Sequence, residues 1–254
     1  MKNGFVCSTG TVVNCESPWT LRLRGGTWSR GYRTSMSEWR SLLAQAKNGD
    51  PEAEWGIADR YADGCKDRRG KIIVRRSATK AAQWFRRAAE HGSAAAQNTL
   101  GVMLSNGDGV RRNVDQALFW LKKAYRSGNS CVAQNIAITY RENGDLKAAV
   151  KWFRKAASAG EGDGDALVEL GIHYYWGKGV RKDATAAVDC FRRATISKNI
   201  CGFGRDDAFF LLGIAYCEGR GVRASIRNAK KMFKQANTDS DHRLAGKMLA
   251  RLQR

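Results

Sequence analysis

Small and apolar residues recur at every fourth position in five similar stretches of the chain. In each stretch, positions i, i+4 and i+8 fall on one stripe of a helix. Position i+5 is Gly or Ala, which lets a second helix approach closely, and an aromatic residue or Leu at i+8 packs over that gap. The pattern therefore predicts five amphipathic helices, over residues 53–61, 96–104, 132–140, 166–174 and 208–216.

A different pattern follows each of these stretches. Alanines at positions i and i+7 flank two larger residues at i+3 and i+4, such as Trp84 and Phe85. This arrangement predicts a second helix, in which small and large side chains interdigitate with the first. The second helices are expected over residues 81–88, 117–124, 149–156, 187–194 and 229–236.

Glycines separate the two patterns, most clearly as Gly-x-Gly-Val at 107–110, 177–180 and 219–222. Glycine tolerates a positive φ and commonly ends a helix. Each unit is therefore predicted to be a helix–turn–helix pair that cannot bury its apolar faces alone, so that stacked units share a continuous core. The predicted repeats cover approximately residues 50–92, 93–128, 129–160, 161–199 and 200–241.

The repeated motif resembles a known family. The order Ala-x-x-x-Leu-Gly-x-x-Tyr, Gly-x-Gly-Val and Ala-x-x-Trp-Phe-Arg-Lys-Ala-Ala is similar to the Sel-1-like repeat, a longer relative of the tetratricopeptide repeat. The resemblance implies an all-α fold, a right-handed α–α superhelical solenoid that scaffolds protein complexes. Three departures are expected to form loops: a basic insertion at 65–77, a short turn at 142–145 and a longer exit at 196–206.

The two ends of the chain differ in character. Residues 37–48 and 242–254 are expected to form capping helices, which a solenoid needs at its termini. Residues 1–35 have no helical period and are rich in basic residues, so the predicted domains are a basic leader over 1–35 and a solenoid over 36–254. The leader is interpreted in three ways: as a disordered segment, as an arm that binds an anionic partner, or as untranslated, with the chain beginning at Met36.

Charge is the unusual feature of the composition. The 44 Lys and Arg exceed the 24 Asp and Glu, giving a net charge of +20, and such a surface attracts polyanions. The seven cysteines are odd in number and lack C-x-x-C spacing, which favours free thiols in a reducing compartment. No apolar run approaches a membrane span and no secretory segment is recognised, so a cytoplasmic protein without an integral membrane segment is expected.

The sequence offers little for catalysis. His91, His173 and His242 fall in different units, and none has Cys, Asp or Glu at metal-ligand spacing. The acidic segment 160–165 lacks the closing Glu of a calcium loop. We therefore predict a non-enzymatic protein with no catalytic residue, cofactor or metal.

Candidate binding residues fall into two groups. Asn98, Asn135 and Glu169 are expected on the concave surface, where amides can hold an extended peptide, and Tyr175 with Trp176 could anchor an apolar group. The inter-helix loops are expected to lie along one edge and to form a basic rim. We define this basic rim as Lys66, Arg68, Arg69, Lys71, Arg75, Arg76, Arg111, Arg112, Arg181, Lys182 and Arg223.

Basic pairs also recur on the second helices, at 86–87, 122–123, 154–155 and 192–193, and are expected to form a solvated outer face. The leading hypothesis is a scaffold or adaptor that holds an acidic protein or peptide, including a regulatory or immunity role. The alternative is RNA or DNA binding through the basic rim, although no nucleic-acid motif is present. The sequence leaves the partner's identity and the oligomeric state open.

Overall fold

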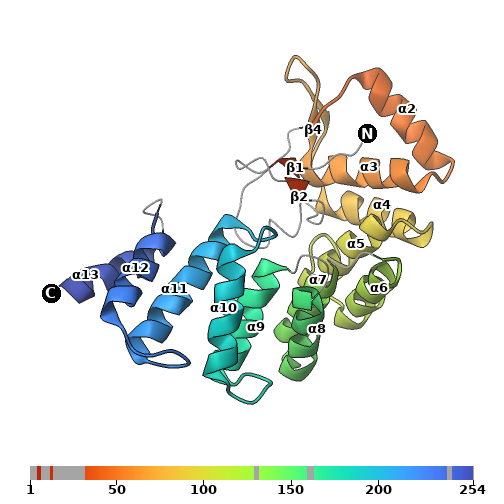
Figure 1. The fold of residues 1–254 in the computed structure, drawn as a ribbon. Coiled ribbons are helices and arrows are strands. Elements are labelled where there is room, and N and C mark those ends of the chain that lie inside the picture. The colour runs from red at the N-terminus through yellow and green to blue at the C-terminus, as the bar shows by residue number, and fades with distance from the viewer. Residues whose placement is uncertain are drawn as a thin grey trace. The chain divides into compact units, whose positions relative to one another are not determined.

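A computed structural model describes residues 5–6, 12–13, 32–128, 132–158, 163–238 and 242–253 (Figure 1). The predicted all-α repeat fold is confirmed, because consecutive antiparallel helices dominate the described chain and pack in sequence order. The described helices are α2 (Met36–Lys47), α3 (Pro51–Asp63), α4 (Ala78–Glu90), α5 (Ala94–Asn106), α6 (Val114–Arg126), α7 (Val132–Glu142), α8 (Leu146–Ser158), α9 (Gly164–Trp176), α10 (Ala184–Ile196), α11 (Gly202–Glu218), α12 (Ile226–Ala236) and α13 (Arg243–Gln253).

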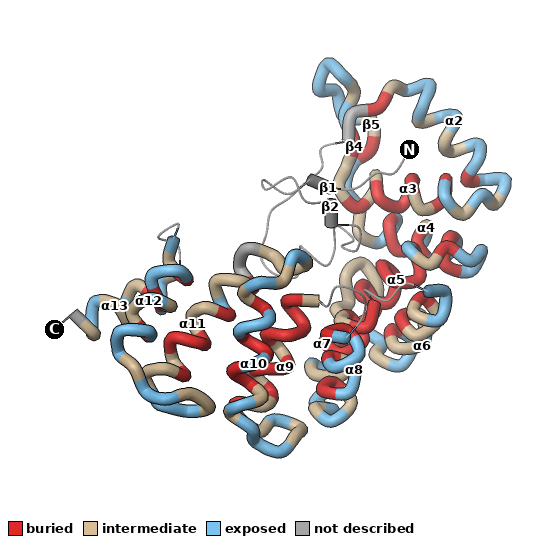
Figure 2. The backbone as a smooth tube through the Cα atoms, in the orientation of Figure 1, coloured by how far each residue is buried: buried red, intermediate tan, exposed pale blue. Residues whose placement is uncertain are grey.

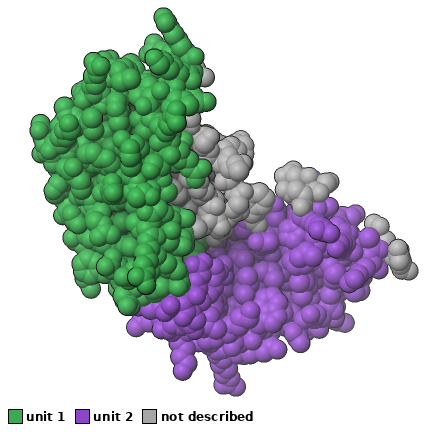
Figure 3. All heavy atoms as spheres, turned by 180° about the vertical axis from the view of Figure 1, so that it is seen from behind, with its two compact units in different colours: residues 1–139 green, residues 140–254 purple. Residues whose placement is uncertain are grey.

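The chain divides into two compact units, residues 1–139 and 140–254 (Figure 3). The boundary falls within α7, in the repeat whose turn is shortest.

Unit 1 contains the capping helix α2 and the hairpins α3–α4 and α5–α6. Its core is built where small residues of one helix meet large residues of the next, as predicted. At Gly101 on α5, a Cβ atom would lie within 3 Å of the Leu121 side chain on α6. Phe85, Leu100 and Leu121 are almost completely buried, and Figure 2 shows the buried faces of the helices turned toward each other.

Unit 2 repeats this packing in the hairpins α9–α10 and α11–α12, with α13 closing the series. At Gly171 and Gly213, a Cβ atom would overlap the rings of Phe191 and Phe233. α13 packs on α12 through Ala245, which is fully buried, so the expected C-terminal cap is formed.

Most helices begin at a side chain that accepts a backbone N–H hydrogen bond, which satisfies a donor that the helix leaves free. The three helices that precede the Gly-x-Gly-Val turns, α5, α9 and α11, each end at a left-handed glycine: Gly107, Gly177 and Gly219. The N-cap residues include Ser35, Asp50, Ser77, Ser93, Asn113, Asp163, Asp183 and Ser225.

The basic insertion in the first repeat is a β-hairpin, where the sequence analysis expected a loop. β4 (Cys65–Lys66) pairs antiparallel with β5 (Ile72–Val74), and β3 (Tyr32–Arg33) adds to β4 in parallel. The turn is closed by Asp67, whose Oδ1 accepts from the backbone N–H groups of Arg69 and Lys71 at 2.9 and 2.8 Å. β-Branched residues at 72–74 favour a strand, and this signal was present in the sequence.

The residues just before α2 also belong to this structure. The Thr34 N–H donates to the Lys66 carbonyl at 3.1 Å, and Ser35 forms a reciprocal capping box with Glu38. Nearer the start of the chain, β1 (Phe5–Val6) pairs antiparallel with β2 (Val12–Val13). The other leader residues that the sequence analysis interpreted lie outside the described residues.

Candidate partner-binding surfaces

The loops between paired helices approach the second helix of the preceding repeat closely. A Cβ atom at Gly109 would overlap the backbone of Ala78, where α4 begins. The second glycine of the other two Gly-x-Gly-Val turns is packed in the same way. A Cβ atom at Gly179 would overlap the backbone of Leu146 at the start of α8, and one at Gly221 would overlap the backbone of Ala184 at the start of α10. Glycine at this position therefore sets the distance between neighbouring repeats as well as the turn.

In unit 1 this approach leaves a cleft, here named cleft A, of about 490 Å³. Arg86 of α4 lines it together with Arg111, which follows the Gly-x-Gly-Val turn. Leu104 and Val110 supply apolar wall. The lining also includes Arg112, Gln116 and Asn113, the N-cap of α6. No carboxylate among the described residues forms an ion pair with Arg86 or Arg111.

Unit 2 contains a cleft at the equivalent repeat position, here named cleft B, of about 690 Å³. Arg192 of α10 corresponds to Arg86, and Arg223 corresponds to Arg111. Val222 supplies apolar wall and Ser225 is the N-cap of α12. Tyr216 takes the place of Leu104, and its hydroxyl accepts from Arg192 Nη2 at 3.4 Å.

The junction between the third and fourth repeats has the same cations but a different cap. Arg154 Nε donates to the Tyr174 hydroxyl at 3.1 Å, as Arg192 does to Tyr216. Arg181 stands at the position of Arg111 and Arg223. The N-cap, however, is the carboxylate of Asp183, where clefts A and B have neutral side chains. We call this place the Asp183 junction.

The predicted basic rim maps to exposed positions on the hairpin and the loops. Lys66, Arg68, Arg69, Lys71, Arg75 and Arg76 are all exposed on or beside β4 and β5. Arg112 is tied down because its Nε donates to the Ser105 carbonyl at 2.9 Å, so its guanidinium stabilises the loop. Arg111, Arg181, Lys182 and Arg223 are exposed in the inter-helix loops. The sequence analysis did not include Arg86 and Arg192 among the candidate binding residues. Both directly follow the recurring Phe of the second helix, Phe85 and Phe191, so their equivalence could be read from the sequence.

The two predicted amide ligands contact each other. Asn135 Nδ2 on α7 donates to Asn98 Oδ1 on α5 at 2.8 Å, and the two residues are 7% and 5% exposed, respectively. Buried side-chain amides require hydrogen-bond partners, and these two residues of neighbouring repeats are partners of each other.

The other predicted ligands lie in unit 2. Glu169 accepts from Arg141, forming an ion pair between α9 and α7. Tyr175 is buried, its hydroxyl donates to Glu218 Oε2 at 2.8 Å, and burial together with that carboxylate raises the pKa of Tyr175 to about 12. Trp176 is 44% exposed at the end of α9 and packs edge-on against Tyr175, so it presents an aromatic surface to solvent.

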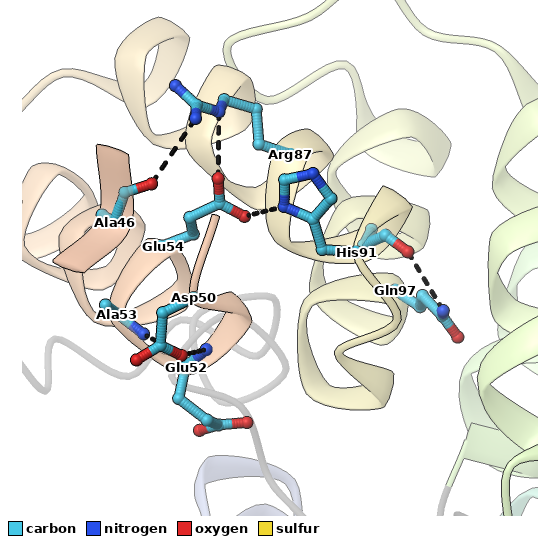
Figure 4. Close-up of polar contacts among 9 residues, drawn as sticks. Ala46, Asp50, Glu52, Ala53, Glu54, Arg87, His91 and Gln97 are labelled. Carbon is cyan, nitrogen blue, oxygen red and sulfur yellow. Dashed lines mark hydrogen bonds and ion pairs between the residues drawn. The ribbon is translucent and has the colours of Figure 1, made fainter. Parts of the chain in front are cut away.

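A buried carboxylate was missed by the sequence analysis. Glu54 on α3 is completely buried, 3.0 Å from Nε of Arg87 on α4 and 2.7 Å from Nδ1 of His91, the C-cap of α4 (Figure 4). The Arg87 guanidinium also reaches the Ala46 carbonyl of α2. A charged group buried this deeply is tolerated when it is paired, and here the pairs join three helices. The cluster therefore holds α2, α3 and α4 together.

No three His, Cys, Asp or Glu side chains in the described ranges gather as metal ligands. None of the described helices combines the length and apolar character needed to cross a membrane. His173 Nδ1 lies 2.6 Å from the Lys178 carbonyl and His242 Nε2 lies 3.3 Å from Asp207, so both make local contacts.

Comparisons with known proteins agree with the repeat pattern. The chain is similar to c5321, a protective antigen of uropathogenic Escherichia coli strains with an SLR fold, at 29% identity and a TM-score of 0.69, covering 84% of this chain and 43% of that one. It therefore spans less than half of that antigen. A Sel1 repeat protein from Oxalobacter formigenes is 26% identical, with a TM-score of 0.63, over 80% of this chain and 79% of that one. The Sel1 repeat model matches residues 51–93, 94–129, 141–161, 164–196 and 207–241, and the chain belongs to the Sel1 repeat family.

Proposed function

We propose that this chain is a non-enzymatic scaffold that holds an acidic protein or peptide at its basic rim. Sel1 repeats generally mediate protein–protein interactions, and a scaffold of this class works without a catalytic centre. The observation that carries the proposal is the exposure of the cationic side chains in the loops and the β-hairpin. The expected cytoplasmic location is part of the proposal and rests on the cysteine pattern.

Electrostatics favour an acidic partner. A net charge of +20 speeds the approach of polyanions, and exposed arginines bind carboxylates through paired N–H donors. Trp176 adds an exposed aromatic side chain at the end of α9, where the loop that carries Arg181 begins. Asn98 and Asn135 already bond each other, so the proposal relies on the rim.

The proposal predicts that the β-hairpin is needed for partner capture. We expect reversal of Arg68, Arg69, Arg75 and Arg76 to Glu to reduce recovery of a protein partner from native lysate by about tenfold, since charge-assisted hydrogen bonds contribute about 1.5–3 kcal/mol each. The measurement is quantitative affinity purification at physiological salt, with and without nuclease. Circular dichroism checks that helicity is retained.

A second quadruple reversal provides the control. Arg227, Lys231, Lys234 and Arg251 are exposed on α12 and α13, outside the rim, and their reversal makes the same change in net charge. We expect this variant to recover the partner almost as the wild type does. Equal losses in both variants, or recovery of nucleic acid that nuclease releases, would contradict the proposal.

A further inference from the structure

We propose that clefts A and B each bind one glutamate side chain of an acidic protein segment. The same positions of different repeats would then recognise the partner. This inference deepens the proposed function by naming the groups that hold the partner. Each cleft combines a cation of one repeat's second helix with a cation of the next repeat's loop, Arg86 with Arg111 and Arg192 with Arg223.

In each cleft, two arginines from different repeats, Arg86 with Arg111 or Arg192 with Arg223, line the same hollow. Arg112 also lines cleft A, where its Nε donates to the Ser105 carbonyl. In cleft A, no described carboxylate neutralises Arg86 or Arg111. In cleft B, Arg192 is oriented by the Tyr216 hydroxyl, which leaves its other N–H groups available. Two planar donor groups facing one space suit a carboxylate, which accepts hydrogen bonds on both oxygens.

The walls of the clefts favour a glutamate over a nucleic-acid phosphate. Leu104 and Val110 line cleft A, and Val222 and Ala224 line cleft B, so each offers apolar surface to the methylene groups of a Glu side chain. Bases of single-stranded nucleic acid bind mainly by stacking on aromatic rings. Cleft A has no aromatic residue in its lining and cleft B has one, Tyr216, so neither offers successive bases a series of rings to stack on.

The N-cap residue distinguishes these clefts from the Asp183 junction. Asn113 and Ser225 cap α6 and α12 with neutral side chains, and their oxygens accept from Gln116 and Asn228 backbone N–H groups at 3.0 and 3.3 Å. Asp183 makes the same bond to Ala186 at 2.9 Å but brings a negative charge beside the equivalent cations. A like charge repels an incoming carboxylate, so the junction does not bind glutamate.

Binding of a fluorescein-labelled hexaglutamate peptide to the full chain, followed by fluorescence anisotropy at physiological salt, tests the inference. We expect the double variant Arg86→Gln with Arg111→Gln, and likewise Arg192→Gln with Arg223→Gln, to weaken binding by about a hundredfold at the altered cleft, as expected for the loss of two charge-assisted contacts. The matched control, Arg154→Gln with Arg181→Gln at the Asp183 junction, should change binding less than twofold. Equal effects at all three places would overturn the inference.

Exchange of the caps provides a test that leaves every arginine in place. Asn and Asp cap helices about equally well, so these changes preserve the fold. We expect Asn113→Asp to weaken hexaglutamate binding and Asp183→Asn to add a binding site, which raises the stoichiometry. An unchanged stoichiometry together with unchanged affinity would overturn the inference.

Three further outcomes bear on the inference, and the last two separate it from the proposed function. A hexauridylate oligonucleotide that binds more tightly than hexaglutamate, with the same dependence on the arginines, would overturn the choice of a carboxylate ligand. If the cleft variants bind hexaglutamate normally while the hairpin variant still loses its protein partner, the cleft inference fails and the scaffold proposal stands. Loss of hexaglutamate binding in the cleft variants, without any captured protein partner, would support the clefts and contradict the scaffold.

Discussion

At the scale of single residues, glycine has two separate roles in the turns of this chain. Gly107 and Gly109 both have a positive φ, of 85° and 68°. Gly109 is also pressed against the backbone of Ala78, where no side chain fits. The first role ends a helix, and the second sets the spacing between repeats that forms cleft A.

Replacement of Gly109 by Ala separates these roles. We expect Gly109→Ala to lower the free energy of unfolding by about 2–4 kcal/mol, because the strain of a positive φ adds to an overlap with backbone that cannot move aside. Gly70 is the control, since its φ is also positive, at 83°, and nothing lies within 4 Å of a Cβ placed there. Gly70→Ala should cost about 1 kcal/mol. Urea unfolding monitored by circular dichroism measures both, and equal losses would contradict the close approach.

At the scale of elements, the β-hairpin and the helix that precedes the repeats form one local structure. β3 pairs with β4, and two residues later Ser35 begins α2 with a capping box that includes Glu38. The hairpin that carries six residues of the basic rim is therefore supported by the chain segment before α2. Arg68 and Arg69 lie in the turn that Asp67 closes, and Arg75 and Arg76 directly follow β5, so the paired strands flank all four arginines.

The cap of α2 is testable by itself. We expect Ser35→Ala to lower the free energy of unfolding by about 1 kcal/mol, the usual effect of losing an N-cap oxygen. Ser41, exposed within the same helix, is the control, because Ser41→Ala improves helix propensity and should leave stability unchanged or raise it by about 0.5 kcal/mol. Thermal unfolding would compare the two variants. A Ser35→Ala variant as stable as the wild type would contradict a structural role for this cap.

At the scale of the whole molecule, we expect the net charge of +20 to set the rate at which an acidic partner associates. The local arrangement of arginines is expected to set the rate at which the partner dissociates. Long-range attraction depends on the total charge and is screened over about 10 Å at 0.1 M salt. Contacts in the clefts and on the hairpin depend on where each cation lies. The two effects should therefore appear in different rate constants.

Surface plasmon resonance with the captured partner tests this separation. We expect both quadruple charge reversals, on the hairpin and on α12–α13, to slow association by a similar factor, because they remove the same charge. The hairpin reversal alone should speed dissociation, by about tenfold for the loss of charge-assisted bonds. Raising the salt concentration should slow wild-type association. Dissociation that is equally fast in both variants would show that net charge alone retains the partner.

Periodicity in the sequence was sufficient to predict the helices, their pairing and the close contacts at Gly101, Gly171 and Gly213, because helix packing depends on which residues recur at 3.6-residue spacing. It also placed the cationic loops between paired helices. Sequence spacing could not show that Asn98 and Asn135 bond each other, that Glu54 is buried between Arg87 and His91, or that Arg86 and Arg111 line one cleft. Those contacts join residues of different helices, and their distances follow from how neighbouring repeats stack, which is a property of the folded chain.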